Sequence, residues 1–272
     1  MNHLETAPWR EALAQVPGAE SGGEAAVQAL AGGTRNATYR VLTGQGAFVV
    51  RLHEHGSDEL GVDRRREALL QTAAAGAGLA PRVLAADAHG RYLVTEFLHG
   101  TVWRAVDMED ESRLRALAQT LRQLHALPPP EVPALDLQAL LQRHVTELGD
   151  GAQDLARSLV RARDILAGQA EAARPACIVH GDLTHSNVIG SDRPRLIDWE
   201  YARVADPLAD LACLVAYYPK AALHGALLLE ESGLSRTASL GALEDLTWVY
   251  RLLSNLWYRR LELARRHPRP AH

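Results

Sequence analysis

The hydrophobic pattern of the chain changes near Gly100, and this change constrains the fold more than any other feature. Before it, short apolar runs alternate with turn residues, as in the runs 37–43 and 47–53 on either side of a Gly-Gln-Gly turn. After it, apolar residues recur three and four positions apart, which is the period of an amphipathic helix. We therefore predict an α+β chain with a small β-rich N-terminal lobe, residues 1–98, and a larger α-rich C-terminal lobe, residues 99–272.

The same patterns predict individual elements. The N-terminal lobe is expected to hold one main helix among its strands, and Asp136 is expected to cap a helix of the C-terminal lobe. The segment 177–198 interrupts the helical pattern and is expected to form short strands around a loop. The predicted strands are 37–43, 47–53, 83–86 and 92–97, and the predicted helices are 60–77, 111–127, 137–148, 153–167, 207–218 and 243–264.

Composition argues against several classes of protein. The formal net charge of −4 lacks the basic excess with which proteins follow a nucleic-acid backbone, so a small-molecule partner is favoured and nucleic acid is not. The two cysteines, Cys177 and Cys213, have no metal-binding spacing and are expected to be buried free thiols. No run approaches the roughly 18 apolar residues of a membrane span, and the N-terminus lacks a secretory apolar region. We expect a soluble cytoplasmic protein with no membrane partner.

A polar loop lies between apolar runs in the C-terminal half. The run CIV leads into HGDLTHSN, which holds Asp182 and Asn187, and the chain then returns to an apolar strand. The next run, RLI, ends at Asp198. Oxygen ligands from a carboxylate and a carboxamide suit Mg²⁺, and a further carboxylate can accept the proton of an attacking hydroxyl group. This set predicts phosphoryl transfer, with Asn187 and Asp198 at the metal and Asp182 as the catalytic residue.

The string HGDLTHSNVI with LIDWE behind it resembles the catalytic loop and metal-binding segment of the aminoglycoside phosphotransferase and choline kinase superfamily. The resemblance implies a bilobal protein-kinase-like fold and transfer of the γ-phosphoryl group of ATP, with Mg²⁺, to a hydroxyl group of a small molecule. It also implies that Arg51, in FVVRL, forms an ion pair with Glu67, behind DRRR, at the nucleotide phosphates. Protein kinases have Lys at the position of Arg51, but the fork of donors on Arg also suits phosphate.

Other nucleotide contacts follow from the same resemblance. The segment GGTRNA is not a GxGxxG loop, yet its backbone N–H groups and the side chains of Thr34 and Asn36 suit phosphate oxygens. Glu96 and Leu98 fall in the linker between the lobes, where the adenine is expected. Neither a Walker A sequence nor a Rossmann fingerprint occurs in the chain.

The acceptor is the least constrained part of the prediction. FVVRL, VDRRRE and IDWEYA most resemble bacterial choline, ethanolamine and thiamine kinases, which favours an amino alcohol or thiamine. Glu200 and Trp257 are the candidate acceptor contacts, because carboxylates and aromatic rings bind quaternary ammonium groups; Trp257 equally fits core packing along its helix. An aminoglycoside or sugar kinase on the same fold is the alternative. A nucleotide sensor without turnover is a third possibility, against which the intact catalytic and metal residues argue.

Several polar residues near these motifs are interpreted as structural. His180 is expected to be buried and to bond the loop backbone. Asp206, which precedes Pro207, is expected to cap a helix. Asp210 is interpreted as structural too, with support of the catalytic loop as the alternative. His53 is expected to be solvated, because no neighbouring residues complete a metal site.

Overall fold

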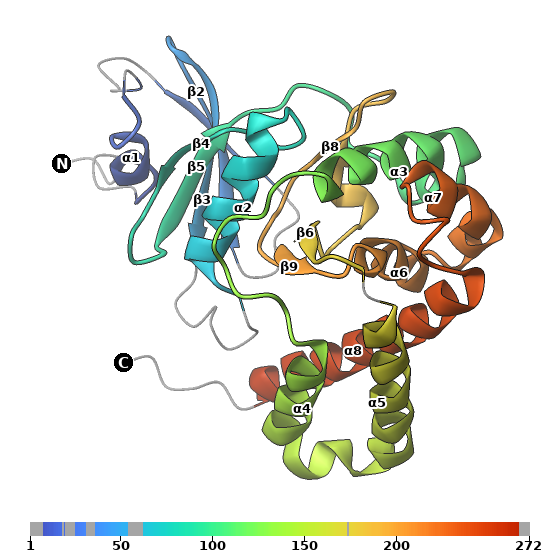
Figure 1. Ribbon diagram of the computed structural model, residues 1–272. Coiled ribbons are helices and arrows are strands. Elements are labelled where there is room, and N and C mark those ends of the chain that lie inside the picture. Colours follow the sequence, from blue (N-terminus) through green and yellow to red (C-terminus); the bar gives the residue numbers. More distant parts are fainter. Residues whose placement is uncertain are drawn as a thin grey trace. The chain divides into compact units, whose positions relative to one another are not determined.

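The computed structural model describes residues 8–17, 19, 25–30, 36–53, 62–172 and 174–266. These residues form two compact units (Figure 1). The first takes the described residues of Met1–Arg104 together with His185–Ala202, and the second takes those of Ala105–Thr184 and Arg203–His272. The first unit is built on an antiparallel sheet and the second is mainly helical, which confirms the predicted α+β class.

A five-stranded antiparallel sheet, in the order β1-β2-β3-β5-β4, forms the base of the first unit. The central hairpin pairs β2 with β3 in continuous register across a turn of Gly44 and Gln45, and the next residue, Gly46, has a positive φ of 139° that suits glycine. The predicted strands are confirmed to within one residue at each end, and β1 adds an edge strand. The strands are β1 Ala26–Ala29, β2 Asn36–Thr43, β3 Gly46–His53, β4 Val83–Ala86 and β5 Tyr92–Glu96.

The two faces of β3 serve different purposes, because successive side chains of a strand point to opposite sides of the sheet. Phe48 and Val50 are buried with Trp9 of helix α1 (Pro8–Leu13) in one apolar cluster. Arg51 directly follows Val50 in the strand, so its side chain points to the other face of the sheet, where it contacts helix α2. The apolar face therefore anchors the sheet, and the opposite face can carry charge.

Helix α2 (Arg64–Gly76) begins later than the sequence pattern suggests. Its N-cap is Asp63, whose carboxylate accepts the backbone N–H of Arg66 at 2.9 Å. This bond satisfies one of the donors that the first turn of a helix leaves unpaired, so the helix starts at residue 64 and not at 60.

A short segment far along the chain belongs to the first unit. It contains the 3-10 turn η4 (His185–Asn187), and strand β7 (Val188–Ile189) pairs with β8 (Arg195–Leu196). The backbone N–H of Leu196 donates to the carbonyl of Leu79 at 2.8 Å. The short strands predicted within 177–198 are confirmed.

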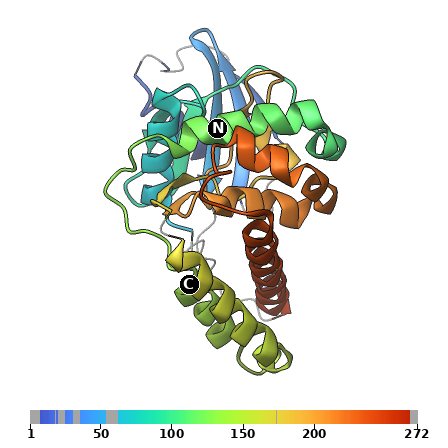
Figure 2. The same cartoon turned by 45° about the vertical axis from the view of Figure 1, so that its right-hand side comes forward.

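The second unit is a group of helices with one small sheet, in which β6 (Cys177–Val179) pairs with β9 (Arg203–Ala205). The helical elements of this unit are η2 Ala105–Glu109, α3 Glu111–His125, α4 Leu137–Leu148, η3 Gly149–Leu155, α5 Ala156–Glu171, α6 Leu208–Tyr217, η5 Pro219–His224, α7 Gly225–Glu231 and α8 Leu240–Arg266. Figure 2 shows α4 and α5 side by side next to the long helix α8, which contacts both of them and also α6.

The starts of α4 and α5 can be compared with the predicted ones. Asp136 caps α4 as predicted, since its carboxylate accepts the N–H of Ala139 at 2.8 Å. The predicted helix 153–167 differs: its first residues form the end of the 3-10 turn η3, and α-helical geometry starts at Ala156.

Cys177 and Cys213 are buried free thiols, as expected. Among the helices that the structure describes, none has the length and apolar character needed to span a bilayer.

Candidate active site

A cluster of charged side chains covers the α2 side of the first unit's sheet, with Arg51 at its centre. The Arg51 guanidinium forms an ion pair with Glu67 of α2, and its Nη1 donates to Oδ1 of Asp198 at 2.5 Å. Its Nε donates to Nε2 of His53 at 3.2 Å. The ion pair implied by the resemblance is therefore present, and it is buried: the side chains of Arg51 and Glu67 are only 10% and 1% exposed.

His53 is half-buried and both of its ring nitrogens have protein partners in this cluster, so the expectation of a solvated histidine is wrong. Its Nδ1 lies 2.7 Å from the carbonyl oxygen of Gly90, while its Nε2 faces Arg51. Burial, together with the nearby charges of Arg51 and Arg64, lowers the pKa of His53 to about 3. The neutral ring therefore donates to Gly90 and accepts from Arg51. His53 lies two residues beyond Arg51 in β3. Both side chains therefore point to the same face of the sheet and can contact each other.

Arg64 is a second arginine in the cluster, and sequence reasoning missed it. Its Nη1 donates to Oε2 of Glu67 at 2.9 Å and to Oε2 of Glu200 at 3.1 Å, and its Nη2 donates to Oδ1 of Asn36 at 3.2 Å. Asn36 also donates to Glu200 at 3.0 Å. Burial and the charge of Arg51 lower the pKa of Arg64. The sequence feature that could have identified Arg64 is its position three residues before Glu67, which places both side chains on the same side of α2.

We call these seven residues the arginine cluster: Asn36, Arg51, His53, Arg64, Glu67, Asp198 and Glu200. Asn36 was expected to contact the nucleotide and Glu200 to contact the acceptor. The structure brings both residues into the same network. In this structure Glu200 is held by Arg64 and Asn36. Thr34, the other predicted phosphate contact of this loop, lies outside the described residues.

The two predicted metal ligands both lie in the 185–202 segment of the first unit. The N–H of Ile197 donates to the carbonyl of Asn187 at 2.9 Å, which places Asp198 immediately after a backbone contact with Asn187. Asp198 has a φ of 61° and is the one described residue other than glycine with a positive φ. Such a conformation costs energy and persists where surrounding contacts enforce it. The Asp198 side chain is 41% exposed, so its carboxylate is accessible.

The donor chemistry of these two residues fits Mg²⁺. This ion is commonly held by one or two carboxylates together with substrate phosphates, and it retains several waters. An amide and a carboxylate are such a set. Among the residues that the structure describes, no group of three or more His, Cys, Asp and Glu side chains forms a self-sufficient metal cage. A carboxylate and a carboxamide would hold such an ion together with phosphate oxygens.

The predicted adenine contacts lie at the end of β5. Glu96 accepts the backbone N–H of Arg82 at 3.0 Å and the Nε of the same residue at 2.9 Å. Leu98 is buried, and the N–H of Phe97 between them donates to the carbonyl of Ala47 at 3.1 Å. The carboxylate of Glu96 is thus engaged by Arg82, and any role of these residues at a nucleotide stays a prediction.

In the second unit, β6 leads directly into the loop of residues 180–183, which we call the Asp182 loop. Gly181 has a φ of 76°, in the left-handed region that favours glycine. His180 is fully buried, and its Nδ1 accepts the N–H of Asp182 at 3.4 Å. Its predicted structural role is therefore observed. Leu183 is fully buried too, so the half-buried Asp182 stands between two anchored residues.

The carboxylate of Asp210, on α6, accepts hydrogen bonds from this loop. Support of the catalytic loop by Asp210 is the alternative that the sequence left open. Its Oδ2 accepts the N–H of His180 at 3.2 Å and its Oδ1 accepts the N–H of Gly181 at 2.9 Å. The same Oδ2 lies 2.9 Å from Nε2 of His125. Asp210 is fully buried, and a buried carboxylate that accepts several hydrogen bonds is a strong positional constraint.

Asp206 lies one residue before the N-cap of α6 and has a second role besides the predicted one. The N-cap of α6 is Pro207, although the carboxylate of Asp206 still accepts the N–H of Leu208 at 2.9 Å. Asp206 also forms an ion pair with Arg174, with Nη2 and Oδ2 separated by 2.7 Å. The residue therefore ties the start of α6 to the segment that precedes β6.

One aromatic side chain of the same unit, that of Tyr217, meets Asp182, and two others of α8 follow it. The phenol of Tyr217, at the end of α6, forms a hydrogen bond with Asp182 and interacts electrostatically with Tyr258 of α8. Tyr217 and Tyr258 are 40% and 58% exposed. Trp257 is half-buried and packs edge-on against Tyr258, with ring centroids 5.0 Å apart. Its Nε1 is buried and has no hydrogen-bond partner among the described residues.

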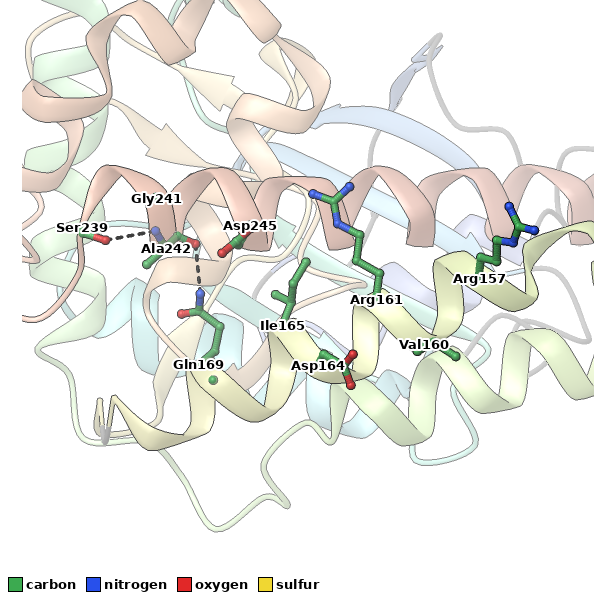
Figure 3. A pocket seen from close by; sticks show the side chains of 11 residues that line it. Arg157, Val160, Arg161, Asp164, Ile165, Gln169, Ser239, Gly241, Ala242 and Asp245 are labelled. Atoms are coloured by element: carbon green, nitrogen blue, oxygen red, sulfur yellow. Dashed lines mark hydrogen bonds between the residues drawn. The ribbon is translucent and has the colours of Figure 1, made fainter.

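A groove of about 760 Å³ between α5 and α8 contains none of the predicted site residues. Figure 3 shows Arg161 reaching from α5 toward α8, where its guanidinium lies 4.3 Å from the ring centroid of Trp248. Gln169, which also lines the groove, donates a hydrogen bond of 3.1 Å to the carbonyl of Ala242. The groove is wide and lined by ordinary surface side chains, so its size alone does not mark it as the reaction site.

Comparison with known proteins agrees with these features. The sequence profile described as "Phosphotransferase enzyme family" matches residues 26–237. A search of curated protein sequences finds no match. Among solved structures, a choline/ethanolamine kinase family protein from Mesorhizobium loti has a TM-score of 0.75 at 23% identity, over 96% of this chain and 87% of the other.

Two further solved structures share the fold. The choline kinase LicA from Streptococcus pneumoniae has a TM-score of 0.71 at 19% identity, over 88% of this chain and 85% of the other. A spectinomycin phosphotransferase in complex with ADP and spectinomycin has a TM-score of 0.61 at 13% identity, over 89% and 84% of the two chains. Since the family profile covers most of its length, this chain belongs to the phosphotransferase enzyme family and is a small-molecule phosphotransferase.

Proposed function

We propose that this protein transfers the γ-phosphoryl group of ATP to a hydroxyl group of a small molecule, and that the acceptor is an amino alcohol or thiamine. The observation that carries the proposal is the Asp182 loop, in which a half-buried carboxylate is held at the end of β6 by buried contacts. Phosphoryl transfer needs little covalent chemistry from a protein. Positioning and charge neutralisation account for most of the lowering of its barrier.

The arginine cluster supplies the charge. Arg51 and Arg64 bring two guanidinium groups to one face of the sheet, and Glu67 orients both of them. Forked donors of this kind match phosphate oxygens. We assign Arg51 to the nucleotide phosphates, with Glu67 as the residue that positions it. Structures of related fold whose descriptions include AMP or ADP support a nucleotide as the donor.

Asn187 and Asp198 would hold Mg²⁺ in this scheme. When bound, the ion neutralises charge on the phosphate oxygens. In the present structure the carboxylate of Asp198 is paired with Arg51. We expect this pair to loosen when the nucleotide binds, because phosphate oxygens and Asp198 then share the guanidinium. Asp182 would accept or orient the proton of the acceptor hydroxyl group.

The aromatic surroundings of Asp182 support the choice of acceptor. Tyr217, whose phenol meets this carboxylate, is partly exposed, Tyr258 is exposed too, and Trp257 packs against Tyr258. A cationic ammonium group is attracted both to aromatic faces and to a carboxylate. The descriptions of two relatives of the same fold as choline or choline/ethanolamine kinases agree with this choice.

A substrate screen tests the proposal. Consumption of ATP is measured with Mg²⁺ present against choline, ethanolamine, thiamine, sugars and aminoglycosides, and the products are identified by mass spectrometry. We expect the highest kcat/KM for an amino alcohol or thiamine. Preferred turnover of a sugar or an aminoglycoside would replace the proposed acceptor and keep the reaction. Tight binding of ATP without turnover of any acceptor would contradict the proposed function and indicate a sensor.

A further inference from the structure

Helix α6 contacts the Asp182 loop through three side chains in one line. Asp210, Cys213 and Tyr217 follow one another at spacings of three and four residues, which places them on the same face of the helix. Asp210 accepts the N–H groups of His180 and Gly181, as described above.

The next two members of the line continue along the loop. The Sγ of Cys213 lies 3.6 Å from the carbonyl oxygen of Gly181, within the range of a thiol hydrogen bond. The phenol of Tyr217 forms its hydrogen bond with the side chain of Asp182. Over two turns of α6, the three side chains therefore contact successive parts of the loop, from its buried start to the side chain of Asp182.

We infer that Tyr217 is a positioning residue for the phosphoryl-transfer reaction, which holds the carboxylate of Asp182 in the orientation that receives the acceptor hydroxyl group. The inference rests on the proposed role of Asp182. A hydroxyl group that donates to one carboxylate oxygen fixes the rotation of the carboxylate about its Cβ–Cγ bond. The other oxygen is then directed at the acceptor, and the carboxylate does not need to reorient during the reaction.

The surroundings of Tyr217 fit this role. Burial, together with the neighbouring Cys213 and Asp182, raises the pKa of the Tyr217 phenol, so the hydroxyl stays protonated and remains a donor. Tyr217 is also the last residue of α6, and the residue as a whole is 40% exposed. The side chain thus joins the rigid helix to the accessible carboxylate.

The matched variants are Tyr217→Phe and Tyr250→Phe. Each removes one phenol oxygen and keeps the ring. Tyr250 lies on α8 in the same unit, and burial raises the pKa of its phenol as well, which makes it a close control. Asp182→Asn is measured in parallel, because it tests the proposed function independently. Steady-state kinetics are recorded with the acceptor that turns over best, together with nucleotide binding and thermal unfolding.

We expect Tyr217→Phe to lower kcat about tenfold, as for loss of a hydrogen bond to a charged group. The KM for the nucleotide and the unfolding temperature should match those of Tyr250→Phe. The acid limb of the kcat/KM profile should also move to higher pH, because a hydrogen bond to a carboxylate favours its charged form.

Three results would overturn the inference while leaving the proposed function intact. They are an unchanged kcat, a rise in acceptor KM alone, and a loss of kcat that Tyr250→Phe reproduces. Normal turnover by Asp182→Asn would instead remove the proposed role of Asp182, and the inference would fail with it. The two failures are therefore distinguishable.

Discussion

The arginine cluster and the Asp182 loop are both buried polar arrangements, but they are held in different ways. In the cluster, charged side chains hold one another: Arg51 alone contacts Glu67, Asp198 and His53. In the loop, backbone N–H groups are fixed by one carboxylate of a helix, that of Asp210. The first network can exchange a protein anion for a ligand anion, whereas the anion of the second, Asp210, is fully buried and bonded to backbone N–H groups and to His125.

This difference matches the two tasks of a phosphotransferase. A group that binds phosphate must be able to change partners, and an ion pair with an exposed carboxylate such as Asp198 allows this. A group that receives a proton must stay in place to within a fraction of an ångström. The comparison predicts that substitutions in the cluster alter nucleotide and metal binding, and that substitutions at the loop alter kcat.

The largest expected effect is that of Asp182→Asn. It removes the carboxylate that receives the acceptor proton and leaves the shape of the loop intact. We expect kcat to fall by at least about a hundredfold, with nucleotide affinity retained. Steady-state kinetics and calorimetric titration of the nucleotide measure the two quantities. Asp164→Asn, an exposed site on α5, is the control and should behave as wild type. Near-normal turnover by Asp182→Asn would contradict the assigned role.

A smaller effect is expected for Arg51→Lys. The ammonium group of lysine keeps the charge but lacks the planar fork with which Arg51 reaches three partners. We expect the KM for the nucleotide to rise about tenfold, while kcat changes much less. Arg163→Lys, at an exposed arginine of α5, is the matched control. A large loss of kcat at unchanged nucleotide KM would place Arg51 in the chemical step and erase the contrast between the two regions.

The smallest effect concerns the pH dependence of folding. His53 is neutral in the folded chain down to pH about 3, whereas an unfolded histidine binds a proton below pH about 6.5. Between these values the unfolded state binds the extra proton, so the free energy of unfolding falls as the pH falls. The contribution between pH 7 and 5.5 is about 1 kcal/mol.

His53→Gln should remove this contribution, and chemical denaturation at the two pH values measures it. The exposed His99 provides the control, and His99→Gln should keep the wild-type pH dependence. Equal pH dependence in His53→Gln and wild type would show that His53 is protonated or solvated in the folded chain.

Local sequence patterns predicted the elements that local interactions determine. Strand β4 and helix α4 begin and end at the predicted residues, and Asp136 caps α4 because its partner lies three residues away. The resemblance also located the pair of Arg51 and Glu67, which the structure contains. These features depend on periodicity, on neighbours in the chain, or on a motif.

The remaining features depend on partners far apart in the sequence. Arg64 acquires its role from Glu200, which lies 136 positions away, and Asp210 acquires its role from loop amides 29 and 30 positions before it. His53 is neutral because burial and the charges of Arg51 and Arg64 lower its pKa, and its Nδ1 bonds the Gly90 carbonyl, 37 positions further along the chain. No local pattern distinguishes such residues from surface charges, so the support of both regions emerged only from the three-dimensional contacts.

The most direct test of the division between the two regions is nucleotide binding measured by calorimetry with and without Mg²⁺ for wild type, Asp198→Ala and Asp182→Asn. We predict that Asp182→Asn binds ATP with wild-type affinity and the same gain from Mg²⁺, while Asp198→Ala loses that gain. Equal Mg²⁺-dependent affinity in Asp198→Ala and wild type would contradict the account, as would loss of nucleotide binding in Asp182→Asn.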